Sequence, residues 1–269
     1  MNEIENKVDI TFFIPCLNEE NNIIGAIENL LSAIRETSLT YEIMVVDDAS
    51  TDKSVEKVET FQKENTDVNI KLVALENNQG LGRNYVDGSF LGSGKYYMMI
   101  NGDNVDPKET ILAIINHIGE ADMIIPNFRG QDSRVWQRRA LSVVFTFLVR
   151  HFSGYNIRYF NGPVAHLRYN VMRWHADTYG FGYQAEIITR VLDEGATYVE
   201  VNVSNTDRDD GGTKAFQFVN FLAVGHSLLQ ILIRRLRKAF VYRPRPITNE
   251  TQSTISKEAS NSKEASNSN

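Results

Sequence analysis

The sequence predicts an α/β fold in which helices cover both faces of a mostly parallel sheet. Three observations support this prediction. Short apolar segments alternate with amphipathic segments through the first 125 residues, 42% of the 269 residues are hydrophobic, and polar side chains gather where several apolar segments end. Such alternation is typical of βαβ units, and a chain of this length can bury one large core.

The first half of the chain contains the regular alternation. Strands are predicted at residues 8–15, 41–47, 68–75, 95–101 and 123–126, because each is a short run of mainly apolar residues. Helices are predicted between them at 19–36, about 51–62, 82–91 and 107–117. We expect Asn18 to cap the first of these helices and Ser50 or Thr51 to cap the second.

The second half is less regular. Helices are predicted at 133–152, 181–194 and 214–240, with a strand at 197–203 and a turn-rich patch, FNGP, at 160–163. After residue 244 the apolar content falls, and SKEASN occurs twice between residues 256 and 267. We therefore predict a folded domain at 1–213, an amphipathic helix at 214–240 and a disordered tail at 241–269.

Charge is unevenly distributed. The formal net charge is −6, yet residues 1–125 carry 22 acidic and 9 basic side chains, whereas residues 126–269 carry 12 acidic and 19 basic ones. An acidic chain without a nucleic-acid-binding motif argues against nucleic acid as a partner. Between residues 126 and 178 there are eight arginines and no lysine, which favours recognition of phosphate or carboxylate; a solvated basic face is the alternative.

Several classes of protein are excluded. The single cysteine, Cys16, excludes an internal disulfide and a cysteine-based zinc site, which favours a reducing, cytoplasmic compartment. The first residues do not form a secretory signal, and no run of about 20 apolar residues predicts a membrane span. The five histidines have no metal-ligand spacing.

Two polar sites follow predicted strands. Asp47 and Asp48, in the sequence VVDDASTD, can accept N–H and O–H donors of a ligand and orient a turn; a helix cap with a spare acid is the alternative. Asn101, Gly102 and Asp103 end the strand at 95–101; the glycine allows close backbone approach, and one carboxylate beside a diphosphate suits a hard divalent cation. The carboxyl ends of parallel strands share an edge, which is where ligands bind such sheets.

The order of four segments resembles the GT-A domain of glycosyltransferase family 2, over about residues 8–215. The segments are PCLNEENN (15–22), VVDDASTDKS (45–54), NNQGLGRNYVDGSFLGSGKYYMMINGDNVDP (77–107) and GFGYQAEIITRVLDEGATYVEV (180–201). Within the family, YQAEIITR and NTDRDDGGTKAF are most similar to segments of the dolichyl- and polyprenyl-phosphate sugar transferases. The resemblance implies a GT-A fold and inverting transfer of a sugar from a GDP- or UDP-sugar to a polyprenyl-phosphate-like lipid, with Mg²⁺ or Mn²⁺ as cofactor.

The resemblance also implies residue roles. Binding of the donor nucleotide falls to Pro15, Leu17, Glu19, Asp47, Asp48, Asn101 and Gly102. The metal ligands are Asp103 and, at the position of the first acid of the DxD motif, Asn101. Binding of the acceptor phosphate falls to Arg129, Arg208, Thr213 and Lys214. The catalytic positions are Asp103, Gln184 and Glu186, the last two near the sugar and the acceptor.

Three positions depart from the family's pattern. Asn101 offers an amide oxygen to a metal but supplies no charge. Val105 stands where glutamine is frequent in the polyprenyl-phosphate branch, with Asp106 one residue further on, and FNGP replaces the branch's Asp-to-Ser-Gly-Phe segment.

The chemical class of the acceptor determines which further catalytic groups the site needs. A phosphate monoester is already ionised near neutral pH and requires orientation by cationic groups rather than a strong base. A sugar or glycolipid hydroxyl would require a carboxylate base, for which Glu186 is the first candidate and Asp177 the second. A third hypothesis, motivated by Asn101, is a nucleotide-sugar-binding protein without catalysis.

Two predicted helices combine apolar and basic residues. The helix at 214–240 ends in RRLRK (234–238), and the helix at 133–152 places Trp136 and Phe147 beside several arginines. This composition is typical of helices lying on an anionic leaflet, and we expect a peripheral position at the cytosolic membrane face. Packing of the helices on each other or across a homo-oligomer is the alternative, and a membrane-anchoring partner is also left open.

Overall fold

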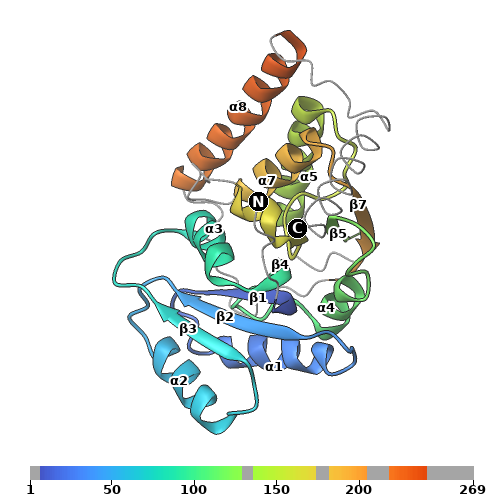
Figure 1. Ribbon diagram of the computed structural model, residues 1–269. Coiled ribbons are helices and arrows are strands. Elements are labelled where there is room, and N and C mark those ends of the chain that lie inside the picture. Colours follow the sequence, from blue (N-terminus) through green and yellow to red (C-terminus); the bar gives the residue numbers. More distant parts are fainter. Residues whose placement is uncertain (1–6, 129–135, 174–181, 205–217, 241–269) are drawn as a thin grey trace, which may run out of the picture. The chain divides into compact units, whose positions relative to one another are not determined.

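The computed structural model describes residues 7–128, 136–173, 182–204 and 218–240 (Figure 1). The strands are β1 (Val8–Cys16), β2 (Tyr41–Asp47), β3 (Ile70–Ala74), β4 (Gly94–Met99), β5 (Met123–Asn127), β6 (Ala165–Leu167) and β7 (Tyr198–Asn202). The helices are α1 (Ile23–Ile34), α2 (Ser54–Glu64), α3 (Leu81–Leu91), α4 (Lys108–Ile115), α5 (Trp136–Ser153), α6 (Arg168–Met172), α7 (Tyr183–Asp193) and α8 (Phe218–Phe240). The chain divides into two compact units, Met1–Leu232 and Ile233–Asn269, so that α8 crosses their boundary.

One sheet organises the first unit. Its strand order is β3-β2-β1-β4-β6-β5-β7. β1 pairs in parallel with β2 and β4, and β5 pairs in parallel with β7, whereas β6 is antiparallel to both β4 and β5. Every strand except β6 therefore ends at the same edge of the sheet, the edge where α/β proteins bind ligands. The predicted mostly parallel α/β fold is confirmed.

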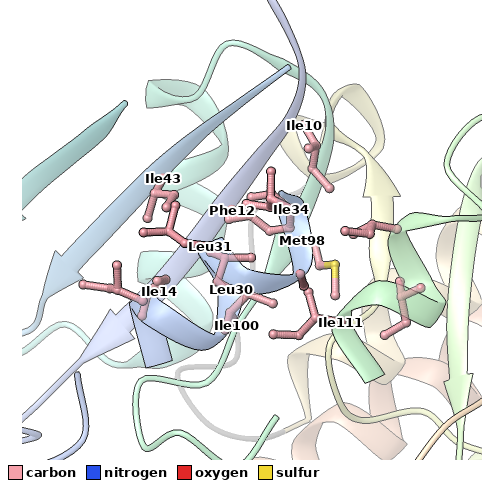
Figure 2. Packing of buried hydrophobic residues seen from close by; sticks show 14 of the residues in the cluster. Ile10, Phe12, Ile14, Leu30, Leu31, Ile34, Ile43, Met98, Ile100 and Ile111 are labelled. Atoms are coloured by element: carbon pink, nitrogen blue, oxygen red, sulfur yellow. The ribbon is translucent and has the colours of Figure 1, made fainter. Parts of the chain in front are cut away.

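The two faces of the sheet are buried by different helices. Ile10, Phe12 and Ile14 of β1 belong to a core cluster that includes residues of α1, α2 and α4, and Figure 2 shows their packing against α1. Phe13, which points the opposite way, belongs to a second cluster with residues of α3, α5, α6 and α7. Successive strand side chains alternate between faces, so a strand covered on both sides becomes apolar almost throughout.

Most predicted elements of the first half are confirmed. The strand at 41–47 coincides with β2, and the other four predicted strands differ from β1, β3, β4 and β5 by one or two residues at their ends. The predicted caps were wrong, because α1 begins after Asn22 and α2 after Lys53. The prediction also missed β6 and α6, which together span only residues 165–172.

None of the helices within the described residues is long and apolar enough to cross a bilayer. The predicted domain division at 213 and 240 stays a prediction, and the tail at 241–269 lies outside the described residues.

Candidate active site

The loops that follow β1 and β2 are joined by hydrogen bonds. Cys16 and Asp47 are partners at the ends of the two strands, and the backbone N–H of Asp48 donates to the carbonyl of Cys16 at 2.8 Å. Asn18, whose φ is 56°, donates its backbone N–H to Ser50 Oγ and accepts the backbone N–H of Thr51 on its side-chain oxygen, each at 2.8 Å. The Asn18 side chain therefore closes the joint between two loops, which is why it does not cap α1.

Asp47 and Asp48 have different tasks. The two oxygens of Asp48 accept the backbone N–H groups of Gln79 (2.7 Å) and Gly80 (3.0 Å), which fixes the turn that leads into α3. Asp47 is 2% exposed; its Oδ2 accepts the backbone N–H of Ser50 at 2.9 Å, and its Oδ1 has no hydrogen-bond partner within the described residues. A buried acceptor without a partner is rare in proteins and is suited to receive an N–H or O–H of a ligand.

The other residues predicted to bind the nucleotide near β1 lie at the same two loops. Glu19 is buried, accepts the side-chain N–H of Asn22 at 2.9 Å, and has its backbone N–H bound to Ser54 Oγ at 2.9 Å. Pro15 and Leu17 are partly exposed. The geometry thus brings all the residues predicted after β1 and β2 into one region.

The loop after β4 packs against the end of β1. A Cβ placed on Gly102 would lie 2.3 Å from the carbonyl oxygen of Pro15, so that only glycine fits there. Further along the loop, Asn104, with φ 60°, accepts the side-chain N–H of Asn29 of α1 at 2.7 Å. These contacts bring the predicted metal and nucleotide residues of the loop after β4 to the predicted nucleotide residues at the end of β1.

Asn101 is bound by an acid that the sequence interpretation gave no role. Its backbone N–H and its side-chain Nδ2 both donate to Asp106 Oδ2, at 2.8 and 2.9 Å. Asp106 is buried, and burial raises its pKa to about 6; the hydrogen bonds from Asn101 oppose this shift, and the charge of Asp103 adds to it. Only the hydrogen bonds in the structure identify this contact, because the spacing of NGDNVD does not show which acidic side chain is buried.

The polar side chains of this loop fit a divalent cation that is also held by a ligand. Within the described residues, no group of three or more His, Cys, Asp or Glu side chains could hold a metal ion by itself. Asp103 offers carboxylate oxygens and Asn101 an amide oxygen, the hard donors that Mg²⁺ accepts together with substrate phosphates and water. These two residues could therefore hold a cation whose remaining positions are filled by a diphosphate.

A second group of buried polar residues involves α7 and β6. The side-chain Nε2 of Gln184 donates to the carbonyl of Gly162 at 3.0 Å, and its Oε1 lies 3.2 Å from His166 Nε2. Burial lowers the pKa of His166 to about 4, and the hydrogen bond to Gln184 opposes this shift only in part. The imidazole is therefore neutral near pH 7, and its Nε2–H donates to Gln184.

This group lies at the ligand-binding edge because of the direction of β6. Ala165 pairs with Met98 of β4 and Ile124 of β5, so the FNGP turn before β6 faces the ends of both strands. Gln184 and Glu186 are both buried in the first turn of α7, 2% and 4% exposed. The sequence interpretation missed His166, because a lone histidine without ligand spacing carries no signal.

The predicted acceptor residues lie outside the described residues. These are Arg129, Arg208, Thr213 and Lys214, together with the alternative base Asp177. Their roles stay predictions.

Comparison with known proteins adds the family. The sequence model described as "Glycosyl transferase family 2" matches residues 11–177, more than half of the chain. The undecaprenyl-phosphate 4-deoxy-4-formamido-L-arabinose transferase of Pectobacterium carotovorum is 21% identical over 229 residues, which cover 85% of this chain and 69% of that protein. The dolichyl-phosphate beta-glucosyltransferase of Dictyostelium discoideum is 27% identical over 109 residues, covering 38% of this chain and 33% of that protein.

Other relatives are matched over part of their length. An uncharacterized glycosyltransferase of Synechocystis is 27% identical over 139 residues, covering 51% of this chain and 43% of that protein. Among solved structures, glucosyl-3-phosphoglycerate synthase of Mycobacterium tuberculosis, in complex with Mn²⁺, UDP-glucose and phosphoglyceric acid, matches with a TM-score of 0.62 at 17% identity. The match covers 86% of this chain and 81% of that one, and it supports the GT-A-like fold. With the family match over residues 11–177, the chain belongs to glycosyltransferase family 2.

Proposed function

We propose that this glycosyltransferase moves a sugar from a GDP- or UDP-sugar to the phosphate of a polyprenyl-phosphate-like lipid, with inversion at the anomeric carbon and with Mg²⁺ or Mn²⁺ as cofactor. The observation that supports the donor part of this proposal is that the ends of three strands lie together. The backbone N–H of Asp48 donates to the carbonyl of Cys16, and Gly102 packs against Pro15. The unpartnered oxygen of Asp47 and the Asn101–Asp106 loop therefore lie at the same edge of the sheet.

Asp47 fits the base or ribose of the nucleotide. Uracil and guanine both present ring N–H groups, and ribose presents hydroxyls, each of which can satisfy the buried Oδ1. Asp48 acts differently under this proposal: both of its oxygens already hold the turn before α3, so it shapes the donor site rather than touching the donor.

The leaving group is the nucleoside diphosphate. An acceptor oxygen forms a bond to the anomeric carbon while the bond from that carbon to the diphosphate oxygen breaks, and the electron pair leaves with the diphosphate. A divalent cation held by Asp103 and Asn101 would act as a Lewis acid that stabilises this charge. Asp103 and Asn101 would hold that cation, and the packing of Gly102 against Pro15 fixes the loop that carries both residues at this edge of the sheet.

The acceptor side is supported by the relatives. The Pectobacterium and Dictyostelium proteins are named for transfer involving undecaprenyl phosphate and dolichyl phosphate. A phosphate monoester, with a second pKa of about 6, is already a nucleophile near pH 7. On this chain, Arg129, Arg208, Thr213 and Lys214 are proposed to orient it, with Gln184 and Glu186 near the sugar.

The exposed face of α5 supports a membrane surface as partner. Trp136, Val143, Val144 and Phe147 are 68, 69, 55 and 65% exposed, and α5 contains three arginines and no acid. α8 has a similar row of exposed apolar residues, Leu229, Ile233, Leu236 and Phe240, and no acid. Apolar side chains flanked by cationic ones fit the interface of an anionic leaflet, so we propose peripheral binding at the cytosolic membrane face.

The test is transfer by the purified protein. Labelled GDP- and UDP-sugars are offered with a short polyprenyl phosphate, first with Mn²⁺ or Mg²⁺ and then with EDTA. We expect a labelled lipid product that EDTA abolishes and that Asp103→Asn lowers by at least about 100-fold, as expected when a transition-state charge loses its support. Asp87→Asn, an exposed acid of α3, makes the same charge change and should leave the rate unaltered.

Other outcomes point to other functions. Donor binding without a lipid product would overturn the proposed acceptor and favour a sugar hydroxyl, with loss of activity in Glu186→Gln as the next measurement. Binding of a nucleotide sugar without turnover on any acceptor or metal would indicate a nucleotide-sugar-binding protein without catalysis.

A further inference from the structure

The Asn101 side chain has one orientation in which its bond to Asp106 forms. A carboxylate can only accept, so the group 2.9 Å from Asp106 Oδ2 is the amide nitrogen. The amide oxygen is bonded to the same carbon at about 120° from the nitrogen and is therefore directed away from that carboxylate oxygen. The same carboxylate oxygen also holds the backbone N–H of Asn101 at 2.8 Å.

Asp106 is itself held firmly. It is 5% exposed and immediately precedes Pro107, after which α4 begins. Four side chains of α4 are buried, Thr110, Ile111, Ile114 and Ile115, and α4 packs against α1. The other side of the loop is fixed by Gly102 on Pro15. Asp106 is therefore a fixed point against which a flexible side chain can be oriented.

We infer that Asp106 positions Asn101 for cation binding: it holds the amide nitrogen, leaves the amide oxygen for the metal, and supplies the negative charge that the loop lacks at position 101. This inference rests on the metal use in the proposed function. The loop then contains two carboxylates, Asp103 and Asp106. The amide oxygen of Asn101 is a neutral donor to the metal, whereas the amide oxygen of Asn104 is bound by Asn29. Asp106 is a positioning residue and does not touch the metal.

The family's DxD motif suggests the opposite effect of a substitution at position 101. Asn101→Asp restores an acid at the first DxD position, which by itself should improve metal binding. Next to Asp106, however, the new carboxylate oxygen would occupy the place of the amide nitrogen, about 2.9 Å from a second carboxylate oxygen with no hydrogen bond between two ionised groups. The restored acid should therefore turn away or remain protonated, and it should weaken metal binding.

The test is a double-mutant cycle on Mn²⁺ affinity. The affinity is measured by paramagnetic resonance of Mn²⁺ in the presence of saturating UDP and, in parallel, of saturating GDP. The variants are Asn101→Asp, Asp106→Asn and the double exchange, with Asp87→Asn as the control for removal of an exposed acid. We expect at least a tenfold weaker Mn²⁺ affinity for Asn101→Asp, and for the double variant an affinity at least fivefold tighter than for Asn101→Asp alone. In EDTA, the nucleotide affinity of each variant should differ from that of the wild type by less than about twofold, because the substitutions alter the positioning of the metal.

Each result decides the inference. Mn²⁺ binding by Asn101→Asp as tight as or tighter than by the wild type would overturn it, and so would additive losses in the cycle or an equal loss of nucleotide affinity in EDTA. Wild-type protein that binds neither nucleotide with Mn²⁺ would overturn the proposed metal use instead. In that case thermal unfolding without ligand tests the contact between residues 101 and 106. Asn101→Asp should lower the stability, and adding Asp106→Asn to it should restore that stability; if it does not, the contact is rejected.

Discussion

Gly102, in the loop after β4, packs directly against the Pro15 carbonyl of β1. Its missing side chain leaves room for the Pro15 carbonyl, and the atoms involved are backbone, which cannot rotate aside as a side chain can. Gly102→Ala should therefore separate the two loops, lower stability by about 1–3 kcal/mol as overpacking does, and weaken nucleotide binding at least tenfold. Thermal unfolding and titration with UDP and GDP would measure both effects.

Gly225→Ala is the matched control. It adds the same methyl group in α8, where no atom of the described residues, apart from the adjoining backbone of the helix itself, lies within 4 Å of the new Cβ, and it raises helix propensity. Equal losses in both variants would mean that the contact with Pro15 has no special importance.

At this scale the sequence predicted positions better than it predicted partners. Gly102 was expected to allow close approach and does so. Asn18 was expected to cap a helix and instead joins two loops, because the partner that its side chain finds, Thr51, is 33 residues away. The sequence indicates no role for Asp106, since its burial and its hydrogen bond with Asn101 depend on the packing of α4.

At the scale of elements, the strands and helices of the first half were predictable because each has its own apolar period. β6 was not, since a three-residue strand is too short to show a period and its direction is set by its neighbours. Without β6, the sequence could not place the FNGP turn at the ends of β4 and β5. The functional part of the second half was therefore predicted only through the resemblance to a family.

The exposed face of α5 gives the prediction at this scale. Phe147→Glu replaces an apolar side chain that is 65% exposed with an acid, so it should reduce binding to anionic vesicles several-fold without affecting the fold. Sedimentation with vesicles of phosphatidylglycerol and phosphatidylcholine, compared with phosphatidylcholine alone, measures the effect.

Phe90→Glu on α3 is the control. Phe90 is 50% exposed, and α3 contains one arginine, whereas α5 contains three. Unchanged vesicle binding by Phe147→Glu, or an equal loss by Phe90→Glu, would contradict a specific role of α5.

For the whole molecule, the buried His166 couples stability to pH. Its pKa is about 4 in the folded chain and about 6.5 in the unfolded one, so the unfolded chain binds more protons between these values. The contribution of His166 to stability is therefore fully present above pH 6.5 and is lost as pH falls toward 4. Asp106, whose pKa is raised to about 6, acts in the opposite direction over much of this range, so the wild-type curve alone does not separate them.

The difference between the wild type and His166→Gln isolates the histidine. At pH 7.5 the variant should be less stable, because the bond to Gln184 is altered in a buried site. By pH 5 that deficit should shrink by about 2 kcal/mol, since only the wild type then excludes a proton. Denaturant unfolding at the two pH values measures it, and a deficit that stays constant would show that His166 titrates normally.

The position of β6 also bears on how the chain acquires its structure during synthesis. Strands β1 to β4 follow one another along the chain, whereas in the described part of the sheet β4 and β5 are linked through β6, residues 165–167. Loop closure over such separations makes non-local pairing slow, and domains form from the N-terminus as they emerge. We expect the half of the sheet formed by β1 to β4 to assemble first, and the half with the FNGP turn, Gln184 and Glu186 to assemble onto it.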